Sequence, residues 1–82
     1  MKNIRKKEIP IIVINVGLKI NEIIKQKNLR QRDVAHDAGL DVENLRKYIK
    51  GKQEMKISTM IKIVESLQIS VQELFTEPKT PN

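Results

Sequence analysis

A chain of 82 residues, 39% of them hydrophobic and with one tyrosine and one phenylalanine as its aromatics, has room for a single small core. The absence of cysteine excludes disulfide scaffolds, thiolate metal sites and cysteine nucleophiles, and it suits a reducing cytosol. A formal net charge of +6 and a pI near 9.8 favour a polyanionic partner, with nucleic acid ahead of a membrane surface.

The N-terminal part predicts a basic arm followed by a helix. Residues 1–8 are rich in lysine and lack apolar periodicity, which indicates a flexible arm. The β-branched run from Ile9 to Ile14 favours a strand. Pro10 at a first helical position favours a helix instead. So does the helical spacing of Ile12, Val16, Ile20 and Ile23. We predict a helix from Ile11 to Lys27, closed by Asn28, with a strand that pairs two chains as the alternative.

The same isoleucine-rich run indicates an intermolecular contact. Its side chains point in too many directions for one helical face to bury them all. The run is too short to cross a bilayer, and Pro10 and Asn15 interrupt it. The hypothesis is a homodimer that forms through Ile9, Ile11, Ile12 and Ile14.

Residues 29–50 predict two short helices joined by a tight turn. Gln31 to Ala38 forms the first of them, because Val34, Ala35 and Ala38 have the spacing of one helical face. Gly39 can adopt the left-handed conformation that ends a helix. The second helix runs from Val42 to Lys50. It is expected to bury Leu45, Tyr48 and Ile49.

Two further helices follow a basic loop. Gly51 ends the previous helix, and the apolar residues Ile57, Met60, Ile61, Val64 and Leu67 define the next one. That helix ends at Gln68, at a cost of about 1 kcal/mol if glutamine is forced into the left-handed conformation. A short helix covers Val71 to Phe75, and residues 76–82 are expected to be a disordered tail.

Helix starts are marked by hydrophobic staples and by capping residues. The staples pair Leu29 with Val34, Leu40 with Leu45, and Ile69 with Leu74. Asp41 and Ser70 are good N-cap acceptors, and Ser70 with Glu73 has the pattern of a capping box. Arg30 has no short acceptor, so the helix that begins at Gln31 is expected to be held less firmly.

One spaced set of residues extends over most of the chain: Leu29, Gln31, Val34, Ala35, Ala38-Gly39-Leu40, Leu45, Lys50-Gly51-Lys52, Thr59, Lys62-Ile63, Leu67, Ser70 and Glu73-Leu74-Phe75. With this set the sequence resembles the Cro-repressor-type (XRE-like) helix-turn-helix DNA-binding proteins from about Val16 to Phe75. The resemblance implies a compact all-α, five-helix domain of the lambda-repressor type over residues 9–75, with its helix-turn-helix core at 29–50.

The chain departs from that family at two positions. Where the family commonly has an arginine and a glutamate in a partly buried ion pair, this chain has Ile24 and Ile49. An apolar pair of suitable shape can replace such an ion pair without loss of stability. We therefore predict that the two isoleucine side chains are in contact.

The resemblance also implies which residues bind DNA. In this fold the helix from Val42 to Lys50 lies in the major groove, while the preceding helix crosses the backbone. Base contacts would come from Gln31, Val42, Glu43, Asn44 and Lys47, of which Gln31 and Asn44 could also reach a phosphate. Phosphate contacts would come from Arg30, Arg32, Arg46, Lys50, Lys52 and Lys56.

An enzyme is not indicated. His36 is the single histidine and has no metal-ligand cluster around it, and the serines lack a nearby base. Gly51-Lys52 lacks the rest of a phosphate-binding loop. We expect no catalytic residues, no metal site and no cofactor.

Two functions remain open. The first is a sequence-specific, double-stranded DNA-binding regulator of transcription in the cytoplasm, acting as a homodimer on half-sites about 34 Å apart. The second is a helix-turn-helix module that binds a partner protein, such as a toxin, with weak or no affinity for DNA. The second is suggested by the acidic residues near the expected interface: Asp33, Asp37, Asp41 and Glu43.

Overall fold

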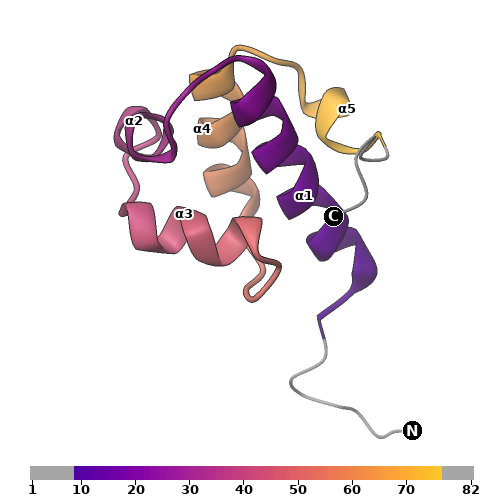
Figure 1. The fold of residues 1–82 in the computed structure, drawn as a ribbon. Coiled ribbons are helices and arrows are strands. Elements are labelled where there is room, and N and C mark those ends of the chain that lie inside the picture. Colours follow the sequence, from indigo (N-terminus) through magenta and orange to yellow (C-terminus); the bar gives the residue numbers. More distant parts are fainter. Residues whose placement is uncertain (1–8, 77–82) are drawn as a thin grey trace, which may run out of the picture.

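The computed structural model describes residues 9–76, which contain five helices and no strand (Figure 1). The helices are α1 (Ile11–Gln26), α2 (Gln31–Asp37), α3 (Val42–Ile49), α4 (Ile57–Leu67) and α5 (Val71–Leu74). Each helix begins at the predicted residue and ends one residue earlier than predicted, because the predicted last residue is its C-cap. The strand alternative for Ile9 to Ile14 is wrong, since α1 includes Ile11 onward.

The predicted arm, residues 1–8, lies outside the described residues. So do residues 77–82 of the predicted tail. Thr76, where that tail was expected to begin, still donates its hydroxyl to the carbonyl oxygen of Glu73 at 2.8 Å. Among residues 9–76 the helices are too short or too polar to span a membrane.

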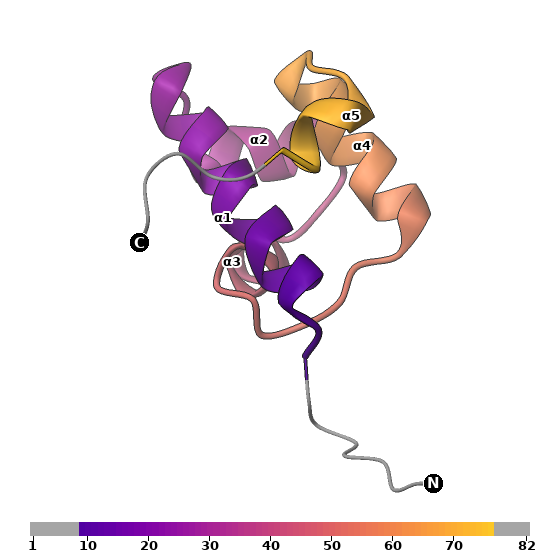
Figure 2. The same cartoon turned by 90° about the vertical axis from the view of Figure 1, so that its right-hand side faces the viewer.

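The helices share one hydrophobic core. α1 packs against α3 and α5, and α2 packs against α3 and α4. Figure 2 shows α3 nearly end-on below α2. The buried core residues are Val16, Ile20, Ile23 and Ile24 of α1, Val34, Ala35 and Ala38 at α2, Leu45, Tyr48 and Ile49 of α3, Ile63, Val64 and Leu67 of α4, and Leu74 of α5. The predicted buried faces of α2 and α3 are therefore confirmed.

The core of α4 differs from the prediction. Ile57, predicted to be part of the buried stripe, is 74% exposed, because it is the first residue of the helix and extends beyond the core. Ile63, which the predicted stripe left out, is completely buried. The buried face of α4 is thus formed by Ile63, Val64 and Leu67, flanked by the half-buried Met60.

A glycine lets α1 and α3 approach each other closely. A Cβ atom on Gly17 would overlap the backbone carbonyl oxygen of Tyr48 and lie 2.8 Å from that of Ile49. Gly51, just after α3, is buried against Ile14, and its added Cβ would lie 3.0 Å from the Cγ1 of that residue. The N-terminal half of α1 therefore holds the C-terminal end of α3 through backbone contacts.

Four helices end in the same hydrogen-bonded turn, the Schellman motif. After α2, the N–H of Gly39 donates to the carbonyl oxygen of His36, and the N–H of Leu40 donates to that of Ala35. The same pair of bonds follows α1, α3 and α4. The left-handed residues of these turns are Asn28, Gly39, Gly51 and Gln68, with φ angles of 61°, 72°, 70° and 59°. The left-handed conformation predicted for Gly39 and considered for Gln68 is confirmed.

The predicted N-cap positions are confirmed, but the predicted side-chain cap bonds are absent. Asp41 and Ser70 lie at the N-cap positions with extended backbones, but neither side chain accepts a cap hydrogen bond. The predicted capping box is also absent, since the N–H of Glu73 donates to the backbone carbonyl oxygen of Ser70 instead. Both capping residues are exposed, so water can satisfy the first-turn amides in their place.

The first residues of the three hydrophobic staples are buried to different extents. Leu40 and Ile69, which precede α3 and α5, pack against the core. Leu29, which precedes α2, is 40% exposed. α2 also begins without a side-chain cap at Arg30, as the sequence led us to expect. Its N-terminal end is therefore the least supported of the three.

Candidate nucleic-acid interface

The helix-turn-helix core consists of α2, the turn at Gly39 and α3. Each helix buries one face, because the apolar residues of both helices point into the common core. The opposite face of α3 is exposed and carries Glu43, Asn44, Arg46, Lys47 and Lys50. The sequence places polar and basic side chains on the surface that the packing of α3 leaves to solvent.

The predicted base-contacting residues are only partly brought together. Glu43, Asn44 and Lys47 are exposed on α3, and Gln31 is half-buried at the first residue of α2. Val42 is also half-buried, because it packs against the core at the first residue of α3. It can offer only part of its side chain to a thymine methyl group.

The predicted phosphate-contacting residues are all exposed. Arg30 and Arg32 lie at the start of α2, Lys50 caps α3, and Lys52 and Lys56 belong to the loop before α4. Basic side chains thus precede and follow the exposed face of α3. This arrangement can neutralise phosphates on both sides of a groove.

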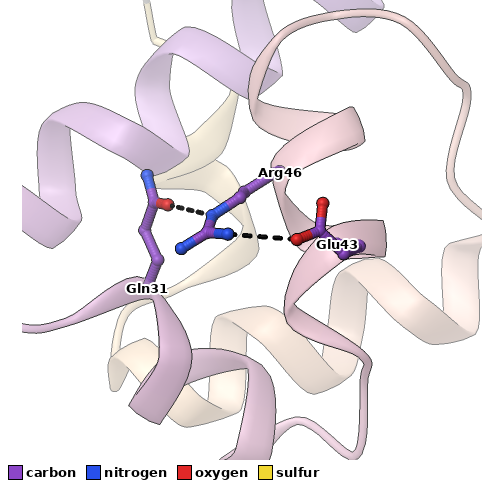
Figure 3. Close-up of polar contacts among 3 residues, drawn as sticks. All are labelled: Gln31, Glu43 and Arg46. Carbon is purple, nitrogen blue, oxygen red and sulfur yellow. Dashed lines mark hydrogen bonds and ion pairs between the residues drawn. The ribbon is translucent and has the colours of Figure 1, made fainter.

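A chain of polar contacts joins α1, α2 and α3 at this face, and Figure 3 shows its part between α2 and α3. The Nε of Arg46 donates to the Oε1 of Gln31 at 3.1 Å, and its Nη1 donates to the Oε2 of Glu43 at 3.2 Å. The Nε2 of Gln31 donates in turn to the Oδ1 of Asn21 on α1 at 3.3 Å. Asn21 was not among the predicted site residues, and the sequence carries no signal for it, since the contact depends on how α1 crosses α2.

The acidic residues near the interface do not form one cluster. Asp33, Asp37 and Asp41 are exposed. Asp37 lines a groove together with Lys62 and Glu65 of α4. Asp37 thus lies beside α4, whereas Glu43 is paired with Arg46 on α3.

The described residues do not assemble a metal site. No group of three or more His, Cys, Asp or Glu side chains among residues 9–76 could hold a metal ion. The Nδ1 of His36 lies 3.8 Å from the carboxylate of Asp37, and its side chain is 90% exposed. An apolar cleft of about 130 Å³ lies between α1, the loop before α4, and Phe75.

The fold and the sequence both resemble known regulators. The family model of the Cro/C1-type HTH DNA-binding domain matches residues 19–79. The restriction-modification controller protein C.AhdI from Aeromonas hydrophila is 25% identical, with a TM-score of 0.74, covering 77% of this chain and 96% of that one. No curated protein sequence matches the chain.

Two more distant structures share the fold. The clp gene regulator ClgR from C. glutamicum is 17% identical with a TM-score of 0.76, over 79% of this chain and 84% of that chain. The hypothetical transcription factor NHTF from Neisseria is 14% identical with a TM-score of 0.75, over 96% of this chain and 87% of that chain.

Proposed function

The chain belongs to the Cro/C1-type helix-turn-helix DNA-binding family, and from this premise we propose that it is a sequence-specific regulator of transcription. The observation that supports the proposal most is the exposed polar face of α3, with basic residues before and after it. The family match confirms the resemblance found in the sequence.

In the proposed complex α3 lies in the major groove. Lys47 suits the O6 and N7 atoms of guanine, and Asn44 suits adenine or a phosphate. Arg30, Arg32 and Lys52 would contact phosphates, which position the protein and supply much of the affinity.

The proposed assembly is a homodimer on two half-sites about 34 Å apart. Of the four isoleucines in the dimer hypothesis, Ile11 and Ile12 are 71% and 48% exposed, whereas Ile9 and Ile14 are half-buried. Ile12 also lines the apolar cleft beside Phe75, which is 50% exposed. The contact proposed here is therefore centred on Ile11 and Ile12. The regulator is proposed to act in the cytoplasm.

The protein-partner alternative is not favoured, because the family match is to a DNA-binding domain. It does, however, define the outcome that would overturn the proposal. A helix-turn-helix module that binds only a protein would show no affinity for duplex DNA at low salt.

The experiment is a salt titration of binding to mixed duplex DNA, followed by selection of bound sequences from a random pool. Affinity should fall steeply with salt, because each phosphate contact adds about 0.9 to the slope of the log–log plot. Lys47→Ala should cost roughly 1 to 3 kcal/mol of binding and relax preference at one base pair. Lys52→Ala should weaken all sequences alike.

Two results would contradict these expectations. No binding of the wild-type chain to any duplex at low salt would overturn the DNA proposal itself. Equal effects of the two lysine changes on selected and random DNA would leave DNA binding intact but refute the separate roles of Lys47 and Lys52.

A further inference from the structure

The contacts around Arg46 suggest how its side chain is prepared for DNA. Arg46 is the junction of the polar chain in Figure 3, since it donates to α2 through Gln31 and to its own helix through Glu43. Two of the five N–H groups of its guanidinium are used in these bonds. The others have no protein acceptor among residues 9–76.

The Gln31 amide is held from two sides, because Arg46 can only donate to its oxygen and Asn21 of α1 accepts from its NH2 group. Asn21 presents its Oδ1 atom to Gln31, so the NH2 group of Gln31 turns toward Asn21 and its oxygen turns toward Arg46. The opposite orientation of the Gln31 amide would place its oxygen against the Oδ1 atom of Asn21 and its NH2 group against the Nε–H of Arg46. Asn21 and Gln31 are both half-buried, which limits how far either side chain can turn.

Glu43 holds the other end of the guanidinium more loosely. Its side chain is 72% exposed and that of Arg46 is 44% exposed. An ion pair this exposed contributes little to stability, because water and salt screen it. A nucleic-acid phosphate, which offers charged oxygens suited to arginine, can therefore take the place of the Glu43 carboxylate.

We propose that Arg46 is a preset phosphate clamp, with Asn21 and Gln31 as its positioning residues and Glu43 as the internal acceptor that a DNA phosphate replaces. This inference rests on the proposed DNA-binding function. It assigns a role to Asn21, which lies outside the helix-turn-helix core, and it gives Glu43 a role different from the base contact expected from the sequence.

The first test removes the internal acceptor. Glu43→Gln should raise the affinity for random duplex at low salt roughly two- to fivefold, the range expected when one surface ion pair no longer competes. Glu65→Gln on α4 is the matched control, because it changes the net charge equally and has no part in the polar chain. Its effect should be smaller than that of Glu43→Gln.

The second test removes the support from α1. Asn21→Ala should lower DNA affinity roughly two- to tenfold, the range expected when one more side chain must be ordered on binding. The slope of affinity against salt should not change, because no charge is lost. Gln26→Ala, which removes an exposed amide from the same helix, should leave the affinity unchanged.

A double-mutant cycle separates positioning from a general loss of structure. In an Arg46→Ala background, Asn21→Ala should no longer lower DNA affinity, and Glu43→Gln should raise it no more than Glu65→Gln does. Persistence of either effect in that background would overturn the proposal. So would a Glu43→Gln change that alters preference at one base pair without raising affinity for random duplex, because Glu43 would then read a base.

These outcomes differ from a failure of the proposed function. If the wild-type chain does not bind duplex DNA, the function itself is wrong. If it binds but Glu43→Gln matches Glu65→Gln and Asn21→Ala matches Gln26→Ala, DNA binding stands and the preset clamp is wrong.

Discussion

At the scale of the residue, the helix ends show where the chain carries backbone strain. Two of the four left-handed positions are glycines, but the others are Asn28 and Gln68. Asparagine tolerates this conformation, because its short side chain can bond locally. Glutamine has no such advantage, and Gln68 therefore carries the larger cost.

Gln68→Gly is expected to stabilise the protein. Relief of left-handed strain is worth about 1 to 2 kcal/mol, and the greater flexibility of glycine in the unfolded chain offsets about half of it. We expect the free energy of unfolding to rise by about 0.5 to 1 kcal/mol in urea denaturation. Lys62→Gly, within α4, should instead lower it by about 1 kcal/mol. A loss of stability in Gln68→Gly would show that this turn is not strained.

Helix C-termini and N-cap positions could be predicted at this scale, but the side-chain bonds of the N-caps could not. A left-handed turn is a backbone requirement, so a glycine such as Gly39 signals it directly. An N-cap hydrogen bond competes with water wherever the helix start is exposed. Asp41 and Ser70 have suitable side chains, but exposure removed the need for their bonds.

At the scale of the element, the contact between α1 and α3 decides how the exposed face of α3 is held. Gly17 permits this contact, because a side chain there would meet backbone carbonyl groups and not flexible atoms. Backbone of this kind cannot move aside without moving the whole helix.

Gly17→Ala is expected to destabilise the protein although alanine favours a helix. Helix propensity alone would add about 1 kcal/mol of stability. Overpacking against the carbonyl groups of Tyr48 and Ile49 should outweigh it and give a net loss of about 1 to 3 kcal/mol in the free energy of unfolding.

Gly39→Ala is the comparison for this change. Its Cβ would lie in open space, so its cost of about 1 kcal/mol comes from the positive φ angle alone. Both variants can be measured by denaturation under the same conditions. A Gly17→Ala protein as stable as the wild type would mean that α1 and α3 separate more easily than the structure indicates.

Periodicity predicted the helices but not every contact between them. The spacing of apolar residues gave all five elements, yet it placed Ile57 in the core of α4 and omitted Ile63. The chain from Asn21 to Arg46 was beyond prediction, because it depends on the crossing of three helices. The contact between Ile24 and Ile49 stays a prediction, although both are buried in the same core.

At the scale of the whole molecule, exposed apolar residues gather at one end of α1. Ile11 and Ile12 are exposed, and Ile12 adjoins Phe75 across the apolar cleft. This end lies next to the part of α1 that contacts Gly51 and holds α3. A shift of α1 caused by a dimer contact at this end would therefore also move the exposed face of α3.

Ile11→Lys is expected to weaken the proposed dimer without unfolding the monomer, since the wild-type side chain is 71% exposed. Sedimentation equilibrium should show a shift toward monomer. The melting temperature should also lose its dependence on protein concentration, because subunit association no longer stabilises the folded state.

Leu29→Lys, beyond the C-terminal end of α1, is the control, as it replaces another exposed apolar residue. It should leave the association unchanged. A wild-type chain that remains monomeric at all concentrations would rule out the contact at Ile11 and Ile12.

The four Schellman turns should protect backbone amides in the connections between helices from hydrogen exchange. The N–H groups of Leu29, Leu40, Lys52 and Ile69 lie outside any helix, yet each is bonded to a carbonyl oxygen five residues earlier. In heavy water these amides should keep their protons about as long as neighbouring helical ones. The amides of residues 53–55, which donate to no backbone carbonyl among residues 9–76, should take up deuterium first.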